Sequence, residues 1–260
     1  MEGRSAAESA ADAASSNPQA PAFSPLYQQI KSLILRSLQA GEWKPGDMIP
    51  SELELAARFK VSQGTVRKAI DELANDNLLV RRQGKGTFVA THTEQNIQYR
   101  FLRLLPDNSS LETQGPAERR IIECRRLRAP ADVARQLGLR TGDSVLQVRR
   151  VLAFGGTPAI LEDVWLPGAP FKGLTLETLA EDKGPMYALF ESQFGIRMVR
   201  AVEKVKAVSA DADTAALLAI EIGQPLLGVE RLAYTYNDVP MELRRGLYRT
   251  ESRHYHNALS

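Results

Sequence analysis

A run of polar and basic residues between positions 61 and 90 has the chemistry needed to bind a polyanion. Amide and guanidinium side chains can form paired hydrogen bonds with base edges, while arginine and lysine bind phosphates as cations. The glycines among them let a backbone approach a ligand closely. The candidate residues, with one serine upstream, are Ser51, Ser62, Gln63, Gly64, Thr65, Arg67, Lys68, Arg81, Arg82, Gly84, Lys85, Gly86 and Thr87.

The distribution of charge along the chain agrees with this location. Residues 25–90 contain 10 basic and 7 acidic residues, a net charge of +3. Residues 1–24 contain 1 and 3, a net charge of −2, and residues 91–260 contain 22 and 21, a net charge of +1. The basic excess therefore lies in the segment with the candidate residues, although a solvated helix face can have the same composition.

Residue types that serve catalysis or bind metals are scarce. The sequence has no His-x-Glu, Cys-x-x-Cys or nucleophile-elbow pattern. His92 lies in a polar stretch, and His254 and His256 near the end suit either a surface metal or a solvated terminus. The single cysteine, Cys124, excludes an internal disulfide framework and fits a reducing cytoplasm. We therefore predict no catalytic residue, no metal site and no cofactor.

Apolar periodicity predicts the elements that position the basic residues. A helix is expected over 25–39, and Ser51 with Glu54 forms a capping box that opens a short helix. The apolar positions of that short helix are Leu53, Leu55, Ala56 and Phe59. Ser62 caps a third helix whose buried positions are Val66, Ile70 and Leu73. Two strands, 78–80 and 87–89, enclose the turn "RQGKG".

This order of elements is that of a winged helix-turn-helix. In such a module the start of the second helix of the pair reaches base edges in the major groove, and a basic hairpin contacts the backbone beside it. Gln63 can pair with adenine, Gly64 permits close approach, and Arg67 lies one turn further on. The alternative is a small helical domain with a solvated basic face.

The sequence pattern in the second half of the chain predicts strands joined in hairpins, with helices between them. The strand segments include "RIIECRRLRAP", "SVLQVRRVLAFGGTPAILEDVWLP", "VRAVEKVKAVSA" and "PLLGVERLAYTYNDVPMELRRGLYR". The pattern predicts an α+β domain on an antiparallel sheet. The predicted helices are 131–137, 174–179, 185–194 and 211–218.

The N-terminal motifs resemble a known family. "PLYQQIKSLI", "GEWKPGDMIPSELELAARFKVSQGTVRKAIDELANDNLL" and "RRQGKGTFV" are similar to the winged-helix domain of the GntR family of bacterial transcription regulators. The family usually has arginine after "VS", where this sequence has Gln63 followed by Gly64. The usual family operator is therefore not expected.

The C-terminal half resembles the UTRA effector-binding domain of the HutC-type subgroup, which has a chorismate-lyase-like fold. "RRVLAFGGTPAILEDVWLP", "GPMYALFESQFGI" and "QPLLGVERLAYTYNDVPMELRRGLYR" carry the resemblance. It implies a small-molecule pocket and dimerisation through this domain. The effector-binding residues expected on this basis are Arg150, Glu162, Tyr187, Glu242, Arg244 and Tyr248.

Two positions depart from the pattern of members that bind phosphorylated sugars. Leu152 replaces an arginine and Pro185 replaces a serine, which removes a guanidinium fork and a hydroxyl from the phosphate site. We therefore expect a non-phosphorylated, carboxylate-type effector that pairs with Arg150 and Arg244. The alternative is that Arg150 and Glu162 form a satisfied structural ion pair, and Arg231 is interpreted as structural.

Together these observations predict a cytoplasmic transcription regulator, most simply a repressor. The predicted organisation is a disordered tail (1–24), a winged helix-turn-helix (25–90), a linker (91–118) and an effector-binding and dimerisation domain (119–260). Its partners are a double-stranded DNA operator, a small-molecule effector and a second copy of the chain. No apolar run reaches the roughly 18 residues of a membrane span. The alternatives are a DNA-binding dimer without a ligand and a lyase-like enzyme.

Overall fold

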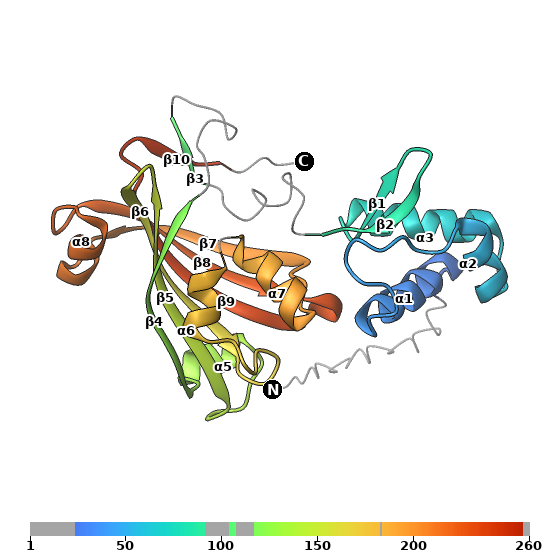
Figure 1. The fold of residues 1–260 in the computed structure, drawn as a ribbon, viewed down its shortest axis with the longest axis horizontal. Helices are drawn as coiled ribbons and strands as arrows, with labels where there is room; N and C mark the ends of the chain where they lie inside the picture. The colour runs from blue at the N-terminus through green and yellow to red at the C-terminus, as the bar shows by residue number, and fades with distance from the viewer. Residues whose placement is uncertain (1–23, 92–103, 108–116, 183, 257–260) are drawn as a thin grey trace, which may run out of the picture.

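The computed structural model describes residues 24–91, 104–107, 117–182 and 184–256. A helical N-terminal unit with a small hairpin precedes a larger antiparallel sheet with helices packed on it (Figure 1). This arrangement confirms the predicted α+β fold class, with an N-terminal winged helix-turn-helix. Nearly all of the predicted tail, most of the predicted linker and His92 lie outside the described residues. Among the described helices, none combines the length and apolar character needed to cross a bilayer.

Three helices form the N-terminal core: α1 (Leu26–Gln39), α2 (Glu52–Phe59) and α3 (Gln63–Asn75). The expected capping box is present, because Ser51 and Glu54 each accept a hydrogen bond from the other's backbone N–H. Ser62 caps α3 by accepting from the Thr65 N–H at 3.2 Å. The helices bury a common cluster that includes Ile34, Leu55, Val66, Ile70 and Leu73.

One predicted apolar position of α2 is wrong. Leu53 is 67% exposed, whereas Leu55 and Ala56 are buried and Phe59 packs against the core cluster. Each helical residue is rotated by about 100° from the one before, so Leu53 lies beside the apolar stripe instead of within it. The position that shares the stripe with Leu55, Ala56 and Phe59 is Glu52.

The hairpin after α3 consists of β1 (Leu79–Arg82) and β2 (Gly86–Val89), each beginning or ending within two residues of its predicted bounds. The strands pair antiparallel, with Arg82 opposite Gly86. Gly84 and Gly86 have φ angles of +69° and +111°. Residues with a Cβ rarely adopt these angles, so the tight basic turn depends on both glycines.

The C-terminal domain is built on a six-stranded antiparallel sheet with the order β4-β5-β6-β9-β8-β7. A separate two-stranded sheet pairs β3 (Leu104–Pro106) with β10 (Arg253–Tyr255). The large sheet contains β4 (Glu118–Arg128), β5 (Ser144–Phe154), β6 (Thr157–Pro167), β7 (Arg200–Ser209), β8 (Pro225–Tyr234) and β9 (Pro240–Tyr248). The short 3-10 turn η2 (Tyr236–Asp238) joins β8 to β9, where Asn237 has a φ of +58°.

Helices cover both faces of this sheet. On one face, α6 (Leu176–Glu181) and α7 (Met186–Phe194) pack against Val148 and Val164 in the largest apolar cluster of the domain. On the other face lie α5 (Ala131–Gln136), which packs on Trp165, and α8 (Ala212–Leu218), which packs on Leu161. Because successive side chains of a strand point to opposite faces, only the polar residues on the face covered by α6 and α7 can lie beneath α7.

Candidate DNA interface and effector site

The first turn of α3 is open to solvent and carries the predicted base-reading side chains. Gln63, Gly64 and Arg67 are exposed, and Thr65 is half-buried. The Ser62 and Thr65 hydroxyls lie 2.8 Å apart, so the capping serine is also tied to the helix it opens. The Thr65 N–H at this end of α3 is therefore already bonded to Ser62, and the exposed side chains around it are polar.

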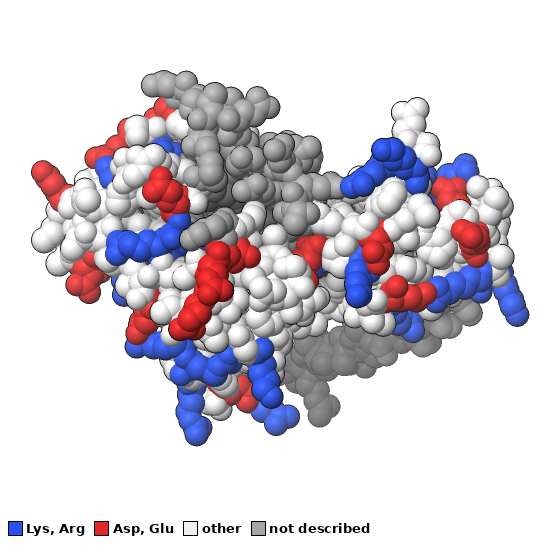
Figure 2. Space-filling model, in the orientation of Figure 1, with Lys and Arg blue, Asp and Glu red and all other residues white. Residues whose placement is uncertain are grey.

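Basic side chains gather on the hairpin beside this helix (Figure 2). Arg81, Arg82 and Lys85 are all exposed, and the Arg82 guanidinium lies 4.7 Å from the centre of the Phe88 ring. Lys68 has a different environment, because its ammonium lies 3.9 Å from the centre of the Tyr27 ring on α1. The first turn of α3 and the hairpin thus provide the polar and cationic surface that the sequence predicted.

Sequence reasoning missed an acidic residue at the centre of this surface. Glu52, the first residue of α2, accepts from Gln63 at 3.1 Å, from Arg67 at 2.9 Å and from Arg81 at 3.0 Å. The sequence contains a signal for this role. Glu52 and the apolar residues Leu55, Ala56 and Phe59 occupy helix positions i, i+3, i+4 and i+7, which form the inward-facing stripe of α2. A charged residue at an inward position requires a partner.

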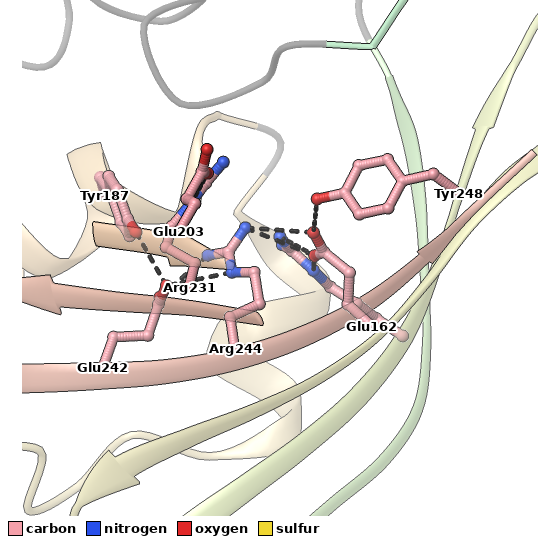
Figure 3. Close-up of polar contacts among 8 residues, drawn as sticks. Glu162, Tyr187, Glu203, Arg231, Glu242, Arg244 and Tyr248 are labelled. Carbon is pink, nitrogen blue, oxygen red and sulfur yellow. Dashed lines mark hydrogen bonds and ion pairs between the residues drawn. The ribbon is translucent and has the colours of Figure 1, made fainter. Parts of the chain in front are cut away.

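Beneath α7, the candidate effector residues form one connected network of charges (Figure 3). Arg150 on β5 and Glu162 on β6 are direct cross-strand partners, with a shortest N–O distance of 2.6 Å. Arg244 on β9 bridges the two carboxylates, at 3.3 Å from Glu162 and 2.8 Å from Glu242. The structure therefore brings together Arg150, Glu162, Glu242 and Arg244, which lie on three neighbouring strands.

Two tyrosines complete this network. The Tyr187 hydroxyl, from α7, donates to Glu242 at 2.7 Å, and the Tyr248 hydroxyl donates to Glu162 at 3.4 Å. Burial and the nearby Glu242 charge raise the pKa of Tyr187, so its hydroxyl remains a donor at neutral pH. All six predicted effector residues are consequently in one contiguous cluster.

The arginines determine the ionisation of this cluster. Burial alone favours the neutral acid, but Arg150 and Arg244 outweigh it and lower the pKa of Glu162 to about 2. Burial opposes the charge of Arg244, but Glu162 and Glu242 raise its pKa well above its ordinary value. The network is therefore held together as alternating full charges in the interior, where such pairing is required.

Two further arginines adjoin the network. Arg231 on β8 is buried and pairs with Glu203 at 2.6 Å, and Glu203 also accepts from the Tyr255 hydroxyl. Arg119 on β4 donates to the backbone carbonyls of Leu179 and Asp182, and burial together with the charge of Arg150 lowers its pKa. Arg119 was not predicted from the sequence, because it is one of several arginines in a strand whose composition does not distinguish buried from exposed positions.

The two departures from the phosphosugar pattern occupy a buried apolar position and the residue before α7. Leu152 is buried in a cluster with Phe154, Val229 and Tyr248. Pro185 is the N-cap residue of α7 and makes no side-chain capping hydrogen bond. Neither side chain provides a group for binding phosphate.

The C-terminal domain contacts the winged helix through Arg197, Val199 and Tyr236. Arg197, which follows α7, is buried and donates to the carbonyls of Asn77 at 2.9 Å and Leu78 at 3.1 Å. Val199 and Tyr236 pack against the same N-terminal core. Asn77 and Leu78 lie between α3 and β1, so this contact meets the end of α3 away from its first turn.

Comparison with known proteins decides the family. Residues 26–89 match the model for bacterial regulatory proteins of the gntR family, and residues 114–254 match the UTRA domain. The chain belongs to the GntR family. Members of this family are transcriptional regulators that bind DNA, and UTRA domains bind small-molecule effectors. The predicted absence of enzymatic activity agrees with this assignment.

Named relatives span both domains of this GntR protein. It is 35% identical over 205 residues to the HTH-type transcriptional repressor PhnF of Mycolicibacterium smegmatis, covering 78% of this chain and 81% of that protein. It is 28% identical over 219 residues to an Escherichia coli O157:H7 protein named a probable fructoselysine utilization operon transcriptional repressor, covering 84% and 88%.

A solved structure also resembles the C-terminal half. It is the ligand-binding domain of a Bordetella bronchiseptica protein assigned to the GntR-family transcriptional regulators. The identity is 56% and the TM-score 0.60, with 62% of this chain and 99% of that one covered.

Proposed function

We propose that this protein is a sequence-specific DNA-binding repressor of the HutC-type subgroup, relieved by a small carboxylate metabolite that lacks a phosphate group. The observation that carries the proposal is the pairing of an exposed reading surface on α3 and the hairpin with a separate, buried charge network beneath α7. Both relatives described above are named as repressors. The proposed domain limits are the ones predicted from the sequence. They place the DNA-reading surface in residues 25–90 and the effector site in residues 119–260.

For DNA binding, the first turn of α3 enters the major groove. Gln63 and Arg67 then read base edges, while Ser62 and Thr65 add hydroxyl contacts and Gly64 allows close approach. The remaining predicted residues are assigned to the phosphate backbone or the minor groove, which the hairpin reaches. They are Ser51, Lys68, Arg81, Arg82, Gly84, Lys85, Gly86 and Thr87.

For effector binding, a carboxylate enters between Arg119 and Arg150. Arg150 is already paired with Glu162, whereas the partners of Arg119 are backbone carbonyl oxygens and the Asp182 carboxylate at 3.8 Å. A charged oxygen binds a guanidinium more strongly than a carbonyl does, so Arg119 gains most from a new carboxylate. Leu152 offers no charge for a phosphate.

Control of DNA binding requires a link between the two sites. The segment from Tyr187 in α7 to Arg197 begins at the charge network and ends at the carbonyls following α3. An effector that shifts α7 therefore changes the contact made by Arg197 and the orientation of the reading surface. Such coupling is typically about 1–3 kcal/mol.

The proposal includes assembly and location. A cytoplasmic homodimer, formed through the C-terminal domains, places two reading surfaces on a two-fold symmetric operator with half-sites about one helical turn apart.

The test begins with selection of DNA from a random library by the full-length protein. Binding to the enriched DNA should weaken steeply with salt, since each phosphate contact releases counterions. The same complex is then titrated with organic acids, amino acids, free sugars and phosphosugars. Release by a carboxylate, lost in Arg119→Gln and Arg150→Ala, supports the proposal. Tighter binding of DNA in the presence of a ligand contradicts the proposed relief of repression. If no compound changes DNA binding, a ligand-independent dimer is favoured.

A further inference from the structure

We propose that Glu52 is a positioning residue for DNA recognition, which orders Gln63, Arg67 and Arg81 and thereby raises the preference of this protein for its operator over other DNA. This inference rests on the proposed DNA-binding function. It concerns an acidic residue within a surface otherwise suited to a polyanion.

The first observation is that donors from two elements converge on one carboxylate. Gln63 and Arg67 come from the first two turns of α3, and Arg81 comes from β1. The Gln63 amide and the Arg67 guanidinium both donate to Oε2 of Glu52, while Arg81 donates to Oε1. Both carboxylate oxygens are therefore occupied by side chains predicted to contact DNA.

The second observation is that the carboxylate itself is held in place. Glu52 is the first residue of α2, directly after the capping box at Ser51, and its side chain is only 15% exposed. Burial opposes its ionisation, but hydrogen bonds from Arg67, Gln63 and Arg81 outweigh burial and lower its pKa. Glu52 is therefore a fixed anion near neutral pH. By contrast, the side chains it orders are 57% exposed for Arg67 and 43% for Arg81.

This arrangement affects operator DNA and other DNA differently. An arginine that is already ordered loses less conformational freedom when it pairs with a base edge, so ordering favours the sequence that fits. On other DNA the same arginines would make phosphate contacts, and a nearby anion restrains and repels that mode. Glu52 therefore raises the ratio of the affinity for operator DNA to the affinity for other DNA, because it favours the first and opposes the second.

The neighbouring acids supply matched controls. Glu72 on α3 pairs with Lys31 of α1 at 3.1 Å. Of the three side chains that Glu52 binds, Asp71 pairs only with Arg81, at 2.6 Å, and Asp71 is 54% exposed. Glu72→Gln removes the same charge without touching any of those three side chains, and Asp71→Asn removes only one of the restraints on Arg81.

The experiment compares full-length wild type, Glu52→Gln, Glu52→Ala, Asp71→Asn and Glu72→Gln. Dissociation constants are measured for DNA enriched from a random library by the wild type and for a scrambled duplex of the same length. Glu52→Gln should lower the affinity ratio by about tenfold while leaving binding to scrambled DNA equal or tighter. Release of Arg67 and Arg81 should also steepen the salt dependence on scrambled DNA by about 0.9 per added phosphate contact.

The outcomes distinguish failure of the positioning role of Glu52 from failure of the proposed DNA-binding function. An unchanged affinity ratio in both Glu52 variants overturns the positioning role and leaves the DNA-binding function intact. Parallel weakening on both DNAs, with a lower melting temperature, assigns Glu52 a structural role instead and also overturns it. Failure of the wild type to enrich any sequence overturns the proposed function and this inference together. A ratio that falls equally in Glu72→Gln shows that net charge alone is responsible, which is again contrary to positioning.

Discussion

Replacing Glu162 by glutamine removes the negative charge that two buried guanidinium groups share. Arg150 and Arg244 both pair with this carboxylate, and all three side chains are less than a tenth exposed. Removing one partner of a buried ion pair typically costs about 3–5 kcal/mol, because the remaining charge is left uncompensated. We expect a loss of this size in the free energy of unfolding of the C-terminal domain near neutral pH.

The pH dependence gives this prediction a sharper form. The folded state lowers the pKa of Glu162 from 4.5 to about 2, so the unfolded chain binds more protons between these values. This difference contributes about 3 kcal/mol above about pH 5 and is lost as the pH falls through the folded pKa. About 1.4 kcal/mol of it should already be lost near pH 3.5. Because glutamine does not titrate, the gap between wild type and variant should narrow by that amount.

The assay is urea unfolding of the full-length chain in a Trp43→Phe background. Trp165, on β6 in the C-terminal domain, is then the only tryptophan and reports that domain by fluorescence. Glu230→Gln is the matched control, since Glu230 pairs with Arg245 on the opposite, partly exposed face and should cost less than about 1 kcal/mol. A Glu162→Gln penalty that is equally small, or one that does not change with pH, would refute the reasoning.

Three further substitutions test other parts of the structure. Arg197→Ala should abolish the effect of effector on DNA binding while changing affinity for operator in the absence of effector by less than about tenfold, measured by fluorescence anisotropy; retained coupling would contradict the role of this contact. Gly246→Ala should destabilise the C-terminal domain by about 1–3 kcal/mol in urea unfolding, because its Cβ would lie 2.5 Å from the Tyr248 ring; no loss would mean that the ring moves freely. Ser51→Ala should lower the stability of the winged helix by about 1 kcal/mol through loss of the capping box, measured by thermal unfolding of that domain. An unchanged melting temperature would contradict it.

Much of the local structure could be predicted because its causes are local. The capping box at Ser51, the cap at Ser62 and the glycines of the hairpin act over a few residues, and each element they predict is present. Leu53 was misplaced because a short helix tolerates one apolar residue outside its stripe. Glu52 was overlooked because only apolar residues were assigned to the inward-facing side of this helix, although Glu52 shares the stripe of Leu55, Ala56 and Phe59.

The strand pattern by itself determined one feature of the effector site. Side chains alternate along a strand, so Arg150 shares a face with Leu152, and Glu242 shares one with Arg244, whatever the rest of the chain does. The hairpin closed by two glycines places β5 beside β6, but Arg150 is opposite Glu162 only because a register shift between Leu152 and Ala153 moves the pairing by one residue. The relations along each strand involve next-but-one neighbours, for which strand geometry leaves few choices.

Only the tertiary structure decided which distant groups meet. Glu162 and Arg244 are 82 residues apart and pair because β9 lies beside β6 in the sheet, an order that no local pattern specifies. Arg197 reaches Leu78 across 119 residues because two separately folded units pack together. Glu52 meets Arg81 because α2 and β1 both pack against α3. Such contacts depend on the burial of whole apolar faces, which is a property of the assembled core and not of any segment.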